Sequence, residues 1–105
     1  MNESKIVIVI TTEADILSAS NLANILLERK LAACISFSRI TSLYWWKDQL
    51  VSTKEVKLII KTSEKKIHQM ELAIRELHSY ENPEFIWFYV NSNNDYKNWI
   101  LETIV

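Results

Sequence analysis

The sequence contains no glycine, and it has one proline and one cysteine in 105 residues. Without glycine it has no Gly-rich loop of the Walker or Rossmann kind, which excludes those phosphate-binding sites. Turns that need a positive φ must use asparagine or aspartate, and the candidates are Asp48, Asn93 and Asn94. The lone Cys34 cannot form an internal disulfide, which is typical of a cytoplasmic protein.

The chain also lacks a charge surplus and a long apolar run. Twelve basic and thirteen acidic residues give a formal charge of −1, whereas nucleic-acid binders usually carry a basic surplus. No apolar run approaches the length of a membrane span. The first residues are acidic and polar and then strand-like, unlike a signal peptide. We therefore expect a cytoplasmic protein that binds neither nucleic acid nor a membrane.

The hydrophobic content of 49% is that of a folded protein, and the length suits one domain spanning residues 1–105. Its most prominent stretch is 31–62, where β-branched and aromatic residues fill two arms around the polar turn 47–49. This pattern predicts a long hairpin. The arm 31–46 would extend for roughly 50 Å, more than a small domain can cover. We therefore expect its far end to lie on another subunit.

A short β-branched run at 5–12 predicts a first strand, because it is too short for a helix and lacks helical periodicity. A helix is expected to follow it. Thr11 or Thr12 is the predicted N-cap, with Glu13 and Asp15 in the first, positively polarised turn.

Ser63 is the predicted cap of a second helix over 64–78, and 84–91 is the predicted fourth strand. Asn94 or Asp95 is expected to start a short last helix. This order predicts an α+β, ferredoxin-like βαββαβ fold with a long hairpin formed by the second and third strands. Both main helices would lie on one face of an antiparallel sheet, as a two-layer α/β sandwich.

Apolar side chains occupy both faces of the first and fourth strands. The alternating sets are Ile6, Ile8 and Ile10 against Val7 and Val9, and Phe85, Trp87 and Tyr89 against Ile86, Phe88 and Val90. Two helices cover only one face of such a sheet. Leaving several hundred Å² of apolar surface in water forgoes many kcal/mol at roughly 25 cal/mol per Å². We therefore expect other copies of the chain to cover the second face, although the last helix with Trp99 could cover part of it.

Three residues could bind a soft or borderline metal ion. Cys34 is either a thiolate ligand or a small apolar strand residue. His68 and His78 lie about 15 Å apart along the second helix, so they cannot share an ion within one chain. His68 is expected to be a solvated surface residue. His78 is expected at the end of the helix, where a positive charge is favoured.

Glu55, Lys57 and Lys61 share one face of their strand by the period of two. They are either the solvated side of the hairpin or part of a cleft that holds a small anion or a metal-bound ligand. Tyr80 and Glu84 could join that cleft.

Tyr44-Trp45-Trp46 is the densest aromatic cluster. It suits an interface anchor at the hairpin tip, with core packing and base stacking as alternatives.

Several motifs, in this order and spacing, resemble the CutA family of divalent-cation-tolerance proteins. They are Leu31-Ala32-Ala33-Cys34, Ser42-Leu43-Tyr44-Trp45-Trp46, Glu55-Val56 with Ile60-Lys61-Thr62, His78-Ser79-Tyr80-Glu81, Pro83-Glu84, and Asp95-Tyr96 with Trp99. The resemblance implies a compact homotrimer with interlocking hairpins and a role in tolerance of copper and other divalent metal ions. It also implies kinship with the nitrogen-signalling PII proteins, and hence a small-ligand cleft between subunits.

By position, Cys34 and His78 match the candidate metal-linked residues of that family. The positions that match its inter-subunit ligand cleft are Trp46, Glu55, Lys61, Tyr80 and Glu84. The leading hypothesis is a non-enzymatic trimer that binds copper, another divalent metal ion or a small ligand between subunits. The alternatives are a PII-like ligand sensor or cleft enzyme using Glu55, Lys61, Tyr80 and Glu84, and a structural trimeric scaffold. An RNA-binding role is disfavoured because the RNP strand pattern is absent.

Overall fold

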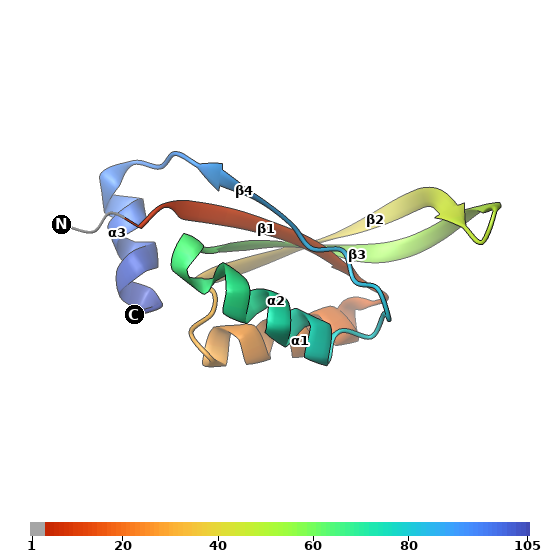
Figure 1. Ribbon diagram of the computed structural model, residues 1–105, viewed down its shortest axis with the longest axis horizontal. Helices are drawn as coiled ribbons and strands as arrows, with labels where there is room; N and C mark the ends of the chain where they lie inside the picture. The colour runs from red at the N-terminus through yellow and green to blue at the C-terminus, as the bar shows by residue number, and fades with distance from the viewer. Residues whose placement is uncertain (1–3) are drawn as a thin grey trace.

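Four strands form one antiparallel sheet in the order β2-β3-β1-β4 in the computed structural model, which describes residues 4–105. The elements along the chain are β1 (Ile6–Glu13), α1 (Ile16–Glu28), β2 (Cys34–Trp46), β3 (Gln49–Ser63), the 3₁₀ turn η1 (Glu64–Lys66), α2 (Ile67–Leu77), β4 (Ile86–Val90) and α3 (Asn94–Thr103). Figure 1 shows this arrangement. The predicted α+β class and order of elements are confirmed.

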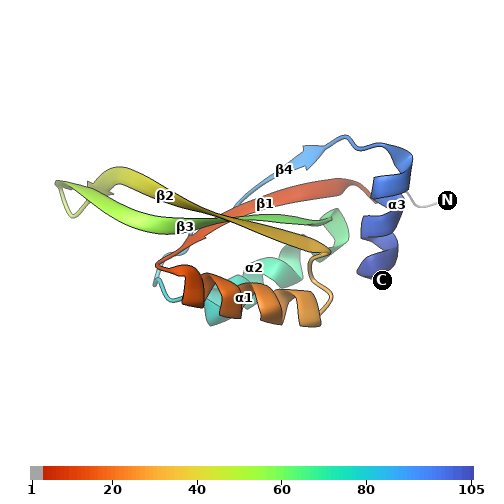
Figure 2. The ribbon, with the colours of Figure 1, turned by 180° about the vertical axis from the view of Figure 1, so that it is seen from behind.

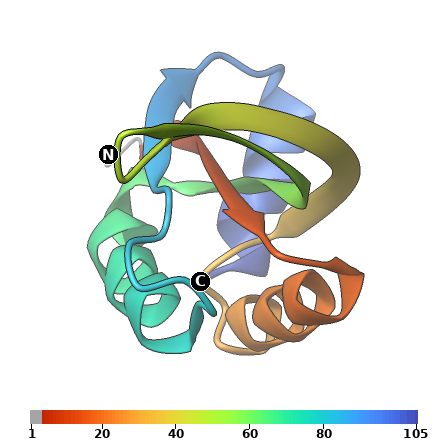
Figure 3. The same ribbon diagram turned by 90° about the vertical axis from the view of Figure 1, so that its right-hand side faces the viewer.

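α1 and α2 lie side by side against one face of the sheet, which we call the inner face (Figure 3). Their buried residues are Ala19, Leu22, Ala23 and Leu26 from α1 and Met70, Ala73 and Ile74 from α2. They pack on Val7 and Val9 of β1 and on Val56, Leu58 and Ile60 of β3. The period-two alternation of these strands therefore supplies the sheet half of the core. The opposite face is called the outer face.

The start of α1 differs from the prediction. β1 continues to Glu13 because its pairing with β3 extends as far as Val56. Thr11 and Thr12 therefore lie buried in the strand, and the predicted cap at either residue is wrong. Asp15 is the N-cap instead, and its Oδ1 accepts a hydrogen bond from the Ser18 backbone N–H at 2.8 Å. That bond holds the pKa of the Asp15 carboxyl below its usual value.

α1 ends with a lysine in the position where helices usually carry glycine. Lys30 has φ 59°, its N–H donates to the Leu27 carbonyl, and the Leu31 N–H donates to the Leu26 carbonyl, both at 3.0 Å. These two bonds form a Schellman motif. The motif turns Leu31 into the core, so β2 begins at Cys34 rather than at residue 31 as predicted.

The hairpin closes through two residues with positive φ. Trp46 pairs with Gln49, and Lys47 and Asp48 between them have φ 50° and 63°, as a two-residue type I′ turn requires. The prediction for Asp48 is confirmed. It is wrong for Asn93, which has φ −61°, and for Asn94, which lies in α3.

The second helix and the fourth strand are both shorter than predicted. Ser63 ends β3, where it pairs with Ile6, and it makes no side-chain capping bond. The single 3₁₀ turn then precedes α2, which ends at Leu77. β4 covers five residues instead of 84–91, because it pairs with β1 only from Ile6 to Ile10.

α3 covers only one end of the outer face. Ile100 and Ile104 pack on Ile6, whereas Trp99 stacks on Tyr96 and stays 45% exposed. α3 lies at the end of the sheet opposite the hairpin tip (Figure 2). Among residues 4–105, no helix is long and apolar enough to cross a membrane.

The hairpin projects beyond the layer of helices, as Figures 1 and 2 show. The extents of the chain are 50 × 24 × 22 Å, and its radius of gyration is 14.6 Å. A compact chain of this length has a radius of gyration of about 13 Å. The distal half of the hairpin, near its tip, consequently has no covering layer within the chain, and Leu43, Trp45 and Leu50 are exposed there.

Candidate functional site

A cavity of about 510 Å³ lies on the outer face, between the hairpin and the loop that leads from α2 to β4. We call it the outer-face cavity. Its lining residues are Thr12, Ser42, Tyr44, Trp46, Val51, Glu55, Tyr80, Glu81, Asn82 and Glu84. Four of the five predicted cleft residues, Trp46, Glu55, Tyr80 and Glu84, are therefore brought together in one chain.

Glu55 is the most deeply placed carboxylate of the cavity. It pairs with Ile40 across the hairpin and is only 9% exposed. Its Oε1 accepts a hydrogen bond from the Tyr80 hydroxyl at 2.8 Å. Within residues 4–105, no lysine or arginine forms an ion pair with it. The alternative that Glu55 belongs to a solvated side of the hairpin is therefore wrong.

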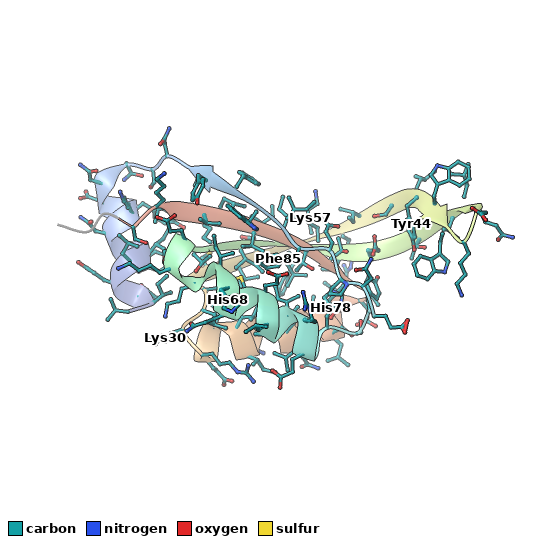
Figure 4. The ribbon with its side chains drawn as sticks, in the orientation of Figure 1. Lys30, Tyr44, Lys57, His68, His78 and Phe85 are labelled. Carbon is teal, nitrogen blue, oxygen red and sulfur yellow. The ribbon has the colours of Figure 1, made fainter. Side chains whose placement is uncertain are left out.

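His78 holds the loop that carries Tyr80. Its ring is buried, its Nδ1 accepts a hydrogen bond from the Tyr80 backbone N–H at 2.9 Å, and its Nε2 contacts the Thr12 carbonyl oxygen. Because Nδ1 acts as an acceptor, the proton sits on Nε2, which donates to Thr12, and the imidazole is neutral. The 3.6 Å approach of Nδ1 to Glu13 Oε2 is then a dipolar contact and not an ion pair. Figure 4 shows His78 at the end of α2 and His68, exposed as predicted, near its start.

Glu13 is a structural residue of the site that the sequence reading misplaced in the first turn of α1. It is buried at the end of β1 and accepts hydrogen bonds from the backbone N–H groups of Ser79, at 3.2 Å, and Ala14, at 3.1 Å. It also accepts a bond from the Ser79 hydroxyl. These contacts hold the loop between α2 and β4 against the sheet and thereby place Tyr80 next to Glu55.

The electrostatics of the cavity are those of an acidic site. Burial raises the pKa of the Glu84 carboxyl, the nearby Glu55 adds to that rise, and Lys57 opposes it. Burial, followed by the hydrogen bond to Glu55, raises the pKa of the Tyr80 phenol above its usual value. Tyr80 therefore stays protonated and neutral at physiological pH, and the carboxylates set the charge of the cavity.

The fifth predicted cleft residue lies elsewhere. Lys61 is six residues from Glu55 along β3, which is about 20 Å. Its Nζ donates a hydrogen bond to the Tyr96 hydroxyl at 3.1 Å, and this bond raises the pKa of the lysine. Lys61 thus faces α3 and contributes nothing to the outer-face cavity of its own chain.

The two predicted metal-linked residues are also separated. Cys34 is half-buried and lies directly opposite Lys61, whereas His78 contacts Thr12, whose partner on β3 is Lys57. Four residues of strand, or about 13 Å, therefore separate them along the sheet. Within residues 4–105, no three His, Cys, Asp or Glu side chains converge closely enough to hold a metal ion.

Comparisons with known proteins give one consistent family. The family model of the CutA1 divalent ion tolerance protein matches residues 7–103. A divalent-cation tolerance protein CutA from Thermotoga maritima is 40% identical over 81 residues, which cover 76% of this chain and 80% of that protein. The protein of the same name from Pyrococcus horikoshii is 36% identical and covers 91% of this chain and 95% of its own.

Solved structures agree with this result over nearly the whole chain. The crystal structure of the divalent ion tolerance protein CutA1 from Ehrlichia chaffeensis has a TM-score of 0.93 at 30% identity, covering 99% of both chains. A structure described as the periplasmic divalent cation tolerance protein CutA from Archaeoglobus fulgidus has a TM-score of 0.93 at 28% identity, covering 95% of this chain and 99% of that one. The chain therefore belongs to the CutA1 divalent ion tolerance protein family.

Proposed function

We propose that the protein acts in divalent-cation tolerance as a homotrimer, without catalysing a reaction, and binds a metal ion or a small ligand in clefts between subunits. The observation that carries this proposal is the uncovered outer face. Ile86 and Phe88 of β4 are 53% and 45% exposed there, beside Ile8 and Ile10. Such a contiguous apolar surface marks an interface between proteins.

The projecting hairpin is the part of the chain that would extend onto a neighbouring copy. Its distal half carries Leu43, Trp45 and Leu50 into solvent, and it extends past the helices of its own chain. Trp and Tyr residues dominate interface energetics, so Trp45, which does not line the outer-face cavity, suits an anchor on a neighbouring copy. A closed ring of copies would cover both the outer face and the hairpin, and the family resemblance favours three.

Copper is the metal ion that we propose for this protein. The Cys34 thiolate is a soft ligand that suits copper(I), and the missing ligands would come from a neighbouring subunit. His78 is the weaker candidate of the two, because both of its ring nitrogens already have partners within the chain. A metal ion on either nitrogen would have to displace Tyr80 or Thr12.

Calorimetric titration of copper(I) and copper(II) tests this assignment. The variants are Cys34→Ser and His78→Ala, with His68→Ala as the control because His68 is an exposed histidine on the same helix. We expect Cys34→Ser to weaken copper(I) binding and His68→Ala to leave it unchanged. Unchanged stoichiometry and affinity in both Cys34→Ser and His78→Ala would remove these residues from the role. Circular dichroism of each variant separates lost binding from lost folding.

A second candidate function is a PII-like sensor or a cleft enzyme at the outer-face cavity. It is supported by the grouping of Trp46, Glu55, Tyr80 and Glu84 around one cavity. The raised pKa of Tyr80 makes this group a poor acid near neutral pH, and Lys61 lies outside the cavity, which favours binding over catalysis. A thermal-shift screen of small metabolites tests it. A stabilising compound whose effect is lost in Glu55→Gln and kept in Lys61→Ala would support ligand binding in the cavity. If no compound stabilises the protein, the remaining interpretation is a structural trimeric scaffold without a ligand.

We also propose the cytoplasm as the compartment. The free, half-buried thiol of Cys34 suits a reducing environment. Fractionation of cells that produce the protein tests this point, and recovery from a periplasmic fraction would overturn it.

A further inference from the structure

We propose that the outer-face cavity binds an organic cation, namely a small molecule that carries an ammonium or guanidinium group. This inference rests on the proposed role of the cavity as a ligand site and names the chemical class of its ligand. Three independent features carry it: an unpaired buried carboxylate, a set of aromatic rings, and a volume that suits an organic molecule.

The charge of the cavity favours a cation. Glu55, Glu81 and Glu84 line it, and no lysine or arginine does so among the described residues. Lys57 acts on Glu84 from outside the lining and forms no ion pair with Glu55. Glu55 is nine-tenths buried, and its only hydrogen-bond partner in residues 4–105 is the neutral Tyr80 phenol. A buried carboxylate without a positive partner is costly, so the site is preorganised for a ligand that supplies the positive charge.

The aromatic rings of the cavity favour the same ligand. Tyr44, Trp46 and Tyr80 contribute to its lining, and the faces of such rings attract ammonium and guanidinium groups. The Trp46 ring already does so within the chain, because the Lys47 ammonium nitrogen lies 5.8 Å from its centroid. Figure 4 shows Tyr44 on the projecting part of the hairpin. Tyr44 and Trp46 therefore line the carboxylate-containing cavity from the hairpin, and Tyr80 lines it from the loop between α2 and β4.

The size of the cavity separates an organic cation from a metal ion. A volume of about 510 Å³ is in the range of small-molecule sites. A divalent ion needs several oxygen, nitrogen or sulfur ligands within about 2–2.6 Å. The described carboxylates, histidines and cysteine form no such group of three. Aromatic rings supply no ligands to a hard ion, whereas they supply most of the contact surface to an alkylammonium group.

The test is isothermal titration of the intact protein with two cations, choline and agmatine, and with 3,3-dimethyl-1-butanol, the uncharged analogue of choline. Trp46→Leu is compared with Trp87→Leu, which removes a partly exposed tryptophan of β4 that does not line the cavity. Glu55→Gln is compared with Glu102→Gln, an exposed carboxylate on α3. Glutamine keeps an acceptor for the Tyr80 hydroxyl, so it removes the charge with little change in shape.

We expect at least one of the two cations to bind about tenfold more tightly than the alcohol, and Trp46→Leu and Glu55→Gln each to weaken it about tenfold. Trp87→Leu and Glu102→Gln should leave the affinity unchanged. Equal binding of the alcohol would show a ligand site of another chemical class and would overturn the inference alone. Absence of binding by all three compounds at about 10 mM would overturn it together with the ligand role of the cavity. Copper titration of the same sample then reports separately on the proposed metal site.

Discussion

At the scale of single residues, two buried threonines have opposite hydrogen-bonding states. The Thr11 hydroxyl has no partner in residues 4–105, whereas the Thr62 hydroxyl donates to the Leu31 carbonyl at 2.7 Å. We predict that Thr11→Val raises the free energy of unfolding by about 1 kcal/mol, because it removes an unsatisfied polar group. Thr62→Val should lower it by about 1–2 kcal/mol, because it leaves a buried carbonyl unpaired. Urea denaturation measures both, and a loss of stability in Thr11→Val would contradict the prediction.

The Glu84 carboxyl predicts a pH dependence of stability. Its pKa is raised in the folded protein, chiefly by burial. Between the usual glutamate value of 4.5 and the raised value, the folded state binds more protons than the unfolded state, so stability falls as pH rises through this window. Glu84→Gln should therefore be more stable than the parent at pH 7, by less than about 1 kcal/mol for a partly solvated group. Thermal unfolding should show the difference vanishing below pH 4.5, and a difference that is constant with pH would contradict this origin.

Residue-level contacts were the part of the site that the sequence could predict least. The family resemblance grouped Trp46, Glu55, Tyr80 and Glu84 as the structure does, but it also placed Lys61 with them, which the structure does not. The role of Glu13 depends on Ser79, which lies 66 residues away, so no local pattern could reveal it. A carboxylate immediately after a buried strand was the only signal, and a helix start explains that signal equally well.

At the scale of elements, a protein without glycine must place other residues at positions with positive φ, and this lowers its stability. Lys30 has φ 59° at the end of α1, where a side chain costs roughly 1 kcal/mol relative to glycine. We predict that Lys30→Gly raises the free energy of unfolding by about 0.5–1 kcal/mol. Gln69→Gly, inside α2 and exposed, should lower it by about 1 kcal/mol, since glycine there only loosens the helix. Destabilisation by both changes in chemical denaturation would mean that the left-handed position is not strained.

The type of each helix and strand could be predicted from the periodicity of apolar residues, but the residues at which each one begins and ends could not. The strands and helices were all expected in the right order, because the alternation of β1 and the spacing of Met70 and Ile74 in α2 are strong signals. The ends depend on competition between neighbours. Pairing of β1 with β3 out to Glu13 overrode a threonine cap, and a Schellman motif at Lys30 delayed the start of β2.

At the scale of the whole molecule, the outer face makes a prediction about assembly. Ile86 and Leu72 are equally exposed, at 53% and 52%, but Ile86 lies on the outer face and Leu72 on α2. Ile86→Glu should break the proposed assembly into folded or partly folded monomers, because it places a charge in a buried apolar contact. Leu72→Glu should leave the assembly intact. Size-exclusion chromatography of both variants measures this, and equal behaviour of the two would contradict the assignment of the interface to the outer face.

The apolar outer face and the projecting hairpin could be anticipated from the sequence, because both faces of β1 and β4 are apolar and the hairpin is too long for the domain. The most direct measurement is the molar mass of the folded protein in dilute solution by light scattering. If three copies share the outer face, the particle mass is three times 12.3 kDa. A particle of 12.3 kDa with native circular dichroism would contradict a shared interior and every site placed between subunits.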